Sequence, residues 1–131
     1  MHLTAAKRKA HIALGKFGED TAVRLLEIKG YQILARNFRL KSGELDIVAL
    51  DGLTIVFVEV KTRRRFPGVT PAWNLSLTQM RRNCTAGKHY LHLFGIPEMP
   101  YRFDLMEVTV DRRRTRHIVE LRHTLDLFPR P

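Results

Sequence analysis

The chain has 131 residues, 44% of them hydrophobic, which suits one compact domain with a core and excludes a multidomain protein. Lys and Arg number 23 against 13 Asp and Glu, so the formal net charge is +10 and a polyanionic partner is the leading explanation. The single cysteine, Cys84, excludes an internal disulfide, and no Cys/His cluster has the spacing of a structural zinc module.

The N-terminal segment is basic but does not read as an export signal. The apolar run after Lys9 is broken by His11 and Gly15, and no stretch approaches the ~20 apolar residues of a membrane span. We therefore expect a soluble, cytoplasmic protein with no membrane association. An organellar transit peptide is the weaker alternative, because the segment runs directly into a helix that carries Glu19 and Asp20.

The first half of the chain predicts one helix and three strands. Thr4 can cap the helix, whose apolar residues follow a broadly helical pattern up to a stop at Lys29-Gly30. Short extended runs follow at residues 31–38, 45–50 and 53–60. Asp51-Gly52 between the last two runs is a strong hairpin signal.

The second half predicts a helix and two further strands. After a loop over residues 62–71, apolar side chains recur at spacings of three and four, which predicts that they pack on the sheet. These residues are Leu77, Met80, Cys84, Gly87, Leu91 and Phe94. Strands are predicted at 102–110 and 117–121, with a basic turn between them. The order is therefore α-β-β-β-α-β-β, a mixed sheet flanked by helices in one α/β domain over residues 1–131. We place its core at about 11–110, and the basic turn and C-terminal strand at 111–131.

Charge is unevenly distributed along the chain. No acidic residue lies between Glu59 and Glu98, whereas this stretch is rich in basic residues. They are Lys61, Arg63, Arg64, Arg65, Arg81, Arg82 and Lys88. This pattern predicts a cationic surface that contacts a phosphate backbone, and ordinary solubilising charge is the alternative.

Acidic residues interrupt strands that are otherwise apolar. If Asp51-Gly52 forms a two-residue turn, the hairpin register makes Asp46 and Glu59 diagonal neighbours, about 7–8 Å apart at Cα. Side chains two residues apart share a face, so Glu44 and Lys61 project from the same side of the sheet.

Crowded carboxylates repel one another and resist desolvation, so a cation or protons must compensate them. All-oxygen ligands suit Mg²⁺ or Mn²⁺, and Mg²⁺ takes only one or two protein carboxylates besides water and phosphate oxygens. This is equipment for phosphodiester hydrolysis, in which Lys61 would orient the attacking hydroxide or neutralise the phosphate. A structural ion pair between Glu59 and Lys61 is the plainer alternative.

An ordered set of motifs runs through the chain. It comprises Gly18-Glu19, Gly30-Tyr31, Asn37-Phe38-Arg39, Gly43-Glu44-Leu45-Asp46, Phe57-Val58-Glu59-Val60-Lys61-Thr62-Arg63 and Arg102-Phe103-Asp104. Over about residues 11–110 the set resembles the YraN-type family of small bacterial proteins. That family is largely uncharacterised and is regarded as having a restriction-endonuclease-like fold, similar to archaeal Holliday junction resolvases.

The resemblance implies a role for each residue of an acidic site. Glu19 is the helical acid, Asp46 and Glu59 are the metal ligands, the Val60 carbonyl is a further ligand, and Lys61 is the catalytic lysine.

Two positions depart from the family pattern. Leu45 stands where similar nucleases often have Pro, which is expected to affect only strand geometry. Gln79 stands where members commonly carry Lys, so this position brings no charge. Arg82, one turn further along the helix, is the candidate substitute.

Together these features predict a Mg²⁺- or Mn²⁺-dependent endonuclease acting on DNA, in particular branched or otherwise structured DNA. Phosphate contacts are expected from Arg63, Arg64, Arg65, Gln79 and Arg82. Resolvase-like cutting would require a homodimer with two sites. The alternatives are a nuclease-like module that binds nucleic acid without cutting it, and a subunit that docks an acidic protein.

Two aromatic residues flank the loop beside this site. Phe66 and Trp73 are each placed either to stack on an unpaired base or to anchor the loop.

Overall fold

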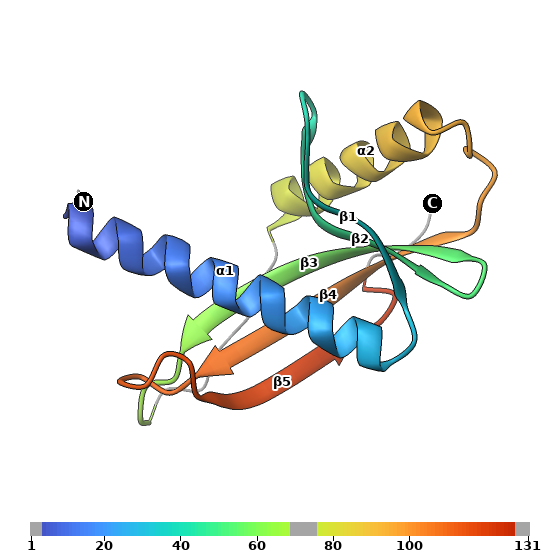
Figure 1. The fold of residues 1–131 in the computed structure, drawn as a ribbon. Helices are drawn as coiled ribbons and strands as arrows, with labels where there is room; N and C mark the ends of the chain where they lie inside the picture. Colours follow the sequence, from blue (N-terminus) through green and yellow to red (C-terminus); the bar gives the residue numbers. More distant parts are fainter. Residues whose placement is uncertain (1–3, 69–75, 128–131) are drawn as a thin grey trace.

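The computed structural model describes residues 4–68 and 76–127 of the chain. Its elements follow the order expected from the sequence (Figure 1). They are α1 (Ala5–Ile28), β1 (Gln32–Leu40), β2 (Gly43–Asp51), β3 (Thr54–Arg64), α2 (Leu77–Leu93), β4 (Tyr101–Val110) and β5 (Ile118–Thr124). The predicted mixed α/β domain is therefore confirmed.

The five strands form one sheet in the order β1-β2-β3-β4-β5. Neighbouring strands are antiparallel except β3 and β4, which are parallel because α2 crosses between them. Helix α1 covers one face of the sheet and α2 the other, so the molecule has two apolar layers (Figure 1). None of the described helices is both long and apolar enough to cross a membrane.

Helix α1 is capped and docked as its sequence indicates. The Thr4 side chain accepts a hydrogen bond from the Lys7 N–H at 3.1 Å, and the helix ends at Lys29 before Gly30, whose φ is +92°. Its close approach to the sheet depends on Gly18, because a Cβ built there would lie 1.8 Å from Thr62 Oγ1 on β3. This contact brings the next residue, Glu19, against the edge of the sheet.

The β2–β3 hairpin corrects the predicted register. Asp51 pairs with Thr54, so the turn residues are Gly52 and Leu53 and not Asp51 and Gly52. Gly52 has φ +61° at the first turn position, where a type II′ turn requires glycine. The pairing moves by two residues, which keeps every side chain on its predicted face.

The buried face of α2 differs in part from the predicted stripe. Gly87 and Leu91 are buried as expected, but Leu77 and Phe94 are exposed. Because Gly87 lies on Phe103 and Phe57, 2.8 Å and 3.0 Å from where a Cβ would be, the helix presents to the sheet the residue before Gly87 and those one turn to either side. These are Asn83, Ala86 and Tyr90.

The predicted loop over 62–71 begins later than expected. Strand β3 continues through Thr62 to Arg64, and these residues pair in parallel with Val108 to Val110 of β4. The end of that loop and Trp73 lie outside the described residues.

Candidate active site

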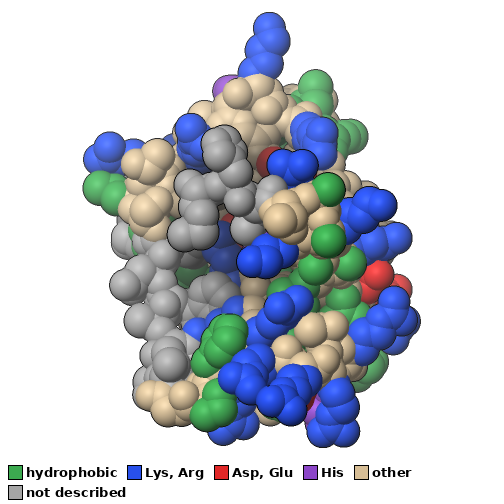
Figure 2. Space-filling model, turned by 90° about the vertical axis from the view of Figure 1, so that its left-hand side faces the viewer, with side chains coloured by type: hydrophobic (Ala, Val, Ile, Leu, Met, Phe, Trp, Pro, Cys, Tyr) green, Lys and Arg blue, Asp and Glu red, His purple; other side chains and the backbone are tan. Residues whose placement is uncertain are grey.

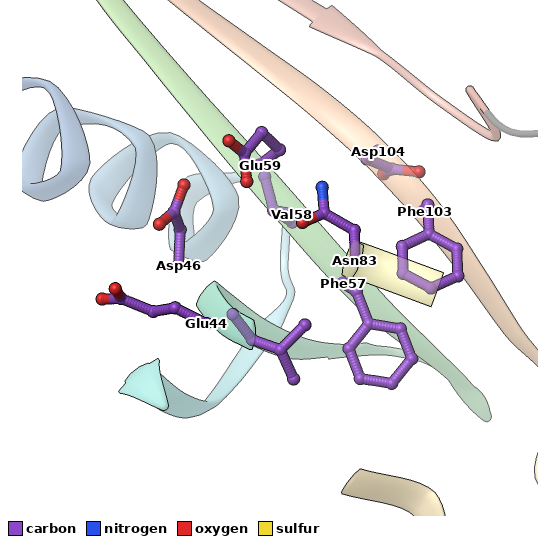
Figure 3. Close-up of a pocket in the computed structure, with 9 residues that line it drawn as sticks. Glu44, Asp46, Phe57, Val58, Glu59, Asn83, Phe103 and Asp104 are labelled. Carbon is purple, nitrogen blue, oxygen red and sulfur yellow. The ribbon is translucent and has the colours of Figure 1, made fainter. Parts of the chain in front are cut away.

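A small pocket opens where the ladder between β2 and β3 ends. The last regular pair is Ile47 with Val58, and one further step in the same register places Asp46 opposite Glu59. The carboxylates of these two residues turn toward one another in Figure 3. The described lining consists of Glu44, Leu45, Asp46, Phe57, Val58, Glu59, Asn83, Phe103 and Asp104.

Beyond the last regular pair, β2 is linked to β3 by a hydrogen bond to the Asp46 side chain in place of a backbone hydrogen bond. Its Oδ2 accepts a hydrogen bond from the Val60 N–H at 2.9 Å, which fixes the carboxylate against β3. The N–H and C=O of one strand residue point toward the same neighbouring strand, so the Val60 carbonyl is directed to this side as well.

Glu59 is the most perturbed carboxyl group of the pocket. Its side chain is 11% exposed, and this burial together with the negative charge of Asp46 raises its pKa to about 7. A hydrogen bond with Asp46, which favours the protonated form of Glu59, contributes to the rise in its pKa. The Lys61 ammonium, 3.2 Å from Glu59, favours the charged form and so opposes the rise.

Glu19 reaches the same carboxylates from α1. Its side chain is 13% exposed, and burial and the charge of Asp46 raise its pKa. Two residues of β1 counter this effect: the Arg36 guanidinium, 3.5 Å away, and the side chain of Asn37, which hydrogen-bonds the carboxylate. The Glu19 carboxylate on α1 therefore interacts electrostatically with Asp46 and is part of the same acidic site.

Asn37 is a site residue that sequence reasoning did not assign. Its φ is +50°, in the left-handed region that few residues other than glycine adopt. The β1–β2 register places it opposite Asp46, between the pairs Arg36–Ile47 and Phe38–Leu45. A backbone held in this conformation between two acidic side chains is a typical feature of functional sites.

Asn83 is the second residue that the sequence did not reveal. It is 4% exposed on α2 and forms a wall of the pocket (Figure 3). Its Oδ1 accepts a hydrogen bond from Gln79 Nε2 at 2.9 Å, so Gln79 is linked to the pocket through it. The only available signal was its position one helical turn after Gln79.

Other predicted residues lie away from the carboxylates. Glu44 turns outward beside the exposed Arg39, 4.0 Å away, and Arg82 is exposed and is not among the described residues that line the pocket. Arg63 to Arg65 follow Lys61 along β3 and line a separate hollow. The structure therefore brings together Glu19, Asp46, Glu59 and Lys61, but not the arginines.

The side chain of Asp104 points away from this site, although the residue borders the pocket (Figure 3). It is fully buried and accepts hydrogen bonds from Arg102 Nε at 3.0 Å, His123 Nε2 at 2.8 Å and the Asp126 N–H at 3.0 Å. Burial opposes its ionisation, yet these bonds hold its pKa below the usual value. Lys29 Nζ can only donate to His123 Nδ1, at 2.7 Å, which sets the tautomer that donates to Asp104. Arg102-Phe103-Asp104 is accordingly a structural motif.

The donor set of the pocket suits a hard divalent cation. Within the described part of the chain, no three His, Cys, Asp or Glu side chains form a complete metal site. Mg²⁺ needs fewer, because it keeps several waters and binds proteins through one or two carboxylates. Asp46 and Glu59, which face one another at the pocket, are the two carboxylates that could hold such an ion.

The comparisons with known proteins agree on one family. A family model described as "Uncharacterised protein family UPF0102" matches residues 18–108, which include all four clustered residues. A UPF0102 protein of Caldicellulosiruptor saccharolyticus is 44% identical over 95 residues, or 72% of this chain and 80% of the relative. A UPF0102 protein of Symbiobacterium thermophilum is 43% identical over 95 residues, again 72% of this chain and 80% of the relative. One of Geobacter sulfurreducens is 42% identical over 108 residues, or 80% and 84%.

Proposed function

The chain belongs to the uncharacterised family UPF0102, and we propose that it is a divalent-metal-dependent endonuclease that hydrolyses phosphodiester bonds in DNA. One observation carries the proposal. Two acidic side chains, Asp46 and Glu59, face one another at a small pocket, and the Lys61 ammonium lies 3.2 Å from Glu59, in a protein of net charge +10. A protein that merely bound phosphates would be weakened by acids placed where phosphates approach.

Asp46 and Glu59 would hold Mg²⁺ or Mn²⁺, with the Val60 carbonyl as a further oxygen donor. The bound ion would lower the pKa of water and stabilise negative charge on the phosphate in the transition state. Asp46 is oriented for this role by the Val60 N–H. Glu59 must lose its proton, so its pKa of about 7 makes the site ready near neutral pH.

Lys61 is placed to act on the reacting groups. Its side chain is 35% exposed, so the ammonium is held by Glu59 but is still accessible. It would orient the attacking water or neutralise the phosphate as charge develops there. Glu19 completes the acidic pocket from α1, and Gln79 with Asn83 supplies neutral hydrogen-bonding groups where relatives commonly carry a lysine.

The test is cleavage of a panel of linear, nicked, flap and four-way DNAs with Mg²⁺ or Mn²⁺. Asp46→Asn and Lys61→Ala should each abolish cleavage, and cooperative thermal melting of both variants should show that they remain folded. Glu98→Gln, an acid-to-amide change at an exposed residue outside the pocket, should cleave like the wild type. Equal turnover by the wild type and the pocket variants would refute the assignment.

A DNA-binding module that does not cut is the second candidate. It is favoured by one finding, that no complete three-ligand metal site exists among the described residues. This candidate predicts tight, salt-sensitive binding with no hydrolysis of any form in the panel. It also predicts that Asp46→Asn binds DNA more tightly than the wild type, because a repelling charge is removed.

A further inference from the structure

A larger hollow lies between α1 and the C-terminal end of β3, beyond the contact of Gly18 with Thr62. It has a volume of about 510 Å³, within the range of small-molecule pockets. Its described lining is His11 and Leu14 of α1 together with residues 62–66. Figure 2 views the molecule from the end at which β3 and β4 terminate, and Lys and Arg side chains gather over this face.

The lining combines an aromatic surface with cations. Phe66 is 50% exposed and faces the hollow together with Leu14, while Arg64 and Arg65 are exposed beside it. Sites for single-stranded nucleic acid have this composition, because bases stack on aromatic rings and the backbone follows the cations. In a paired duplex the base faces are already stacked on one another, whereas an unpaired base can stack on an exposed ring without first being unstacked.

The hollow lies close to the acidic pocket along the same two elements. Leu14 and His11 precede Glu19 by five and eight residues, which is about 8–12 Å along α1. On β3 the chain runs directly from Lys61 through Thr62 to Phe66. The spacing of about 8–12 Å along α1 between the hollow and Glu19 corresponds to a few nucleotides of a DNA strand, at ~3.4 Å or more for each nucleotide.

A second hollow of about 430 Å³ continues the basic surface. It shares Arg65 with the first and is lined also by Arg112 and Arg113 of the turn between β4 and β5. Basic side chains therefore continue from the aromatic hollow in the direction away from the acidic pocket. A bound DNA strand would require such side chains along its path to neutralise its phosphates.

We propose that Phe66 stacks on an unpaired DNA base in the first hollow, with the adjoining phosphates on Arg64 and Arg65. The substrate class is then DNA with a single-stranded segment beside its duplex, such as a flap, a fork or an opened junction. The link to cleavage rests on the proposed nuclease function, whereas the binding preference does not.

Binding is tested on two DNAs in EDTA, so that no cleavage occurs. One is fully paired, and the other is forked and carries 2-aminopurine at its first unpaired position. The wild type should bind the fork more tightly and quench its fluorescence. Phe66→Leu keeps an apolar side chain but no ring, and should weaken fork binding by about 5- to 150-fold without weakening duplex binding. Phe66→Trp should retain the preference.

A matched control separates stacking from charge. Arg65→Ala should weaken binding of both DNAs about equally and reduce the salt dependence by about one charge. Equal binding of fork and duplex by the wild type, or an unchanged preference in a folded Phe66→Leu protein, would overturn the inference.

The outcomes also separate this inference from the proposed function. A fork preference that depends on Phe66, without cleavage in Mg²⁺ or Mn²⁺, would support the inference and refute the nuclease. Cleavage in Mg²⁺ without any fork preference would support the nuclease and overturn the inference.

Discussion

Glu59→Gln should stabilise the protein at neutral and alkaline pH when no divalent cation is present. The ordinary pKa of this carboxyl is 4.5, and burial and Asp46 raise it to about 7 in the folded protein. Between these values the folded state retains a proton that the unfolded state has released, so stability falls as pH rises. At about 1.36 kcal/mol for each tenfold change in proton affinity, the loss amounts to about 3 kcal/mol above pH 7. Glutamine removes the charge and therefore the loss.

The assay is urea denaturation of wild type and variant between pH 5 and pH 9 in EDTA. The two proteins should be similar near pH 5, and the variant should be more stable by about 3 kcal/mol at pH 8–9, or on the order of 10 °C in melting temperature. Exposed Glu98→Gln is the matched control and should follow the wild type at every pH. Parallel pH profiles for the wild type and Glu59→Gln would show that Glu59 ionises as an ordinary surface acid, and the crowded-carboxylate argument would fail.

A divalent cation should largely remove this difference in stability. Mg²⁺ that binds only the folded wild type stabilises it by mass action, by about 2.7 kcal/mol at a hundredfold excess over Kd. Glu59→Gln lacks one of the two proposed carboxylate ligands, so its stability should respond little to Mg²⁺. Equal stabilisation of both proteins would place the cation elsewhere.

Three further changes test the surroundings of the site. Asp104→Asn should destabilise the fold by about 3–5 kcal/mol, because it removes the buried carboxylate that pairs with the Arg102 guanidinium, and calorimetry should show that the wild type loses this contribution as pH falls below the usual Asp range. Gly18→Ala should lower the melting temperature through its clash with Thr62, and adding Thr62→Ala should restore only part, because the Thr62 Cβ itself lies 2.7 Å from the new methyl. Asn37→Gly should keep the left-handed backbone and the melting temperature but raise the Glu19 pKa in NMR titration, whereas an unchanged pKa would exclude the amide contact.

The element order and the sheet faces could be predicted from the sequence because they depend on local patterns. Short apolar runs marked the strands, and the side-chain faces survived the register error because the shift was an even number of residues. The error itself arose at Gly52, since Asp-Gly suits one turn type and Gly at the first turn position suits another. A single sequence offers no local means of choosing between the two.

The walls of the site could not be predicted, because they depend on contacts between distant elements. Asn83 is buried only because Gly87, one turn further along α2, packs against Phe57 and Phe103 and turns that face toward the sheet. Asn37 becomes relevant only when the β1–β2 register sets it opposite Asp46. Neither residue stands out by type or spacing.

The acidic residues are stable in this position because the fold distributes them over three elements. Asp46 ends the regular ladder on β2, Glu59 faces it from β3, and Glu19 arrives on α1 through the close approach at Gly18. The repulsion is limited by protonation of Glu59 and by Lys61, so the fold is expected to tolerate the site without a cation but to lose stability above pH 7. A site whose function did not require these charges would gain stability from a single amide substitution, and the presence of both carboxylates is therefore itself an argument for metal-dependent chemistry.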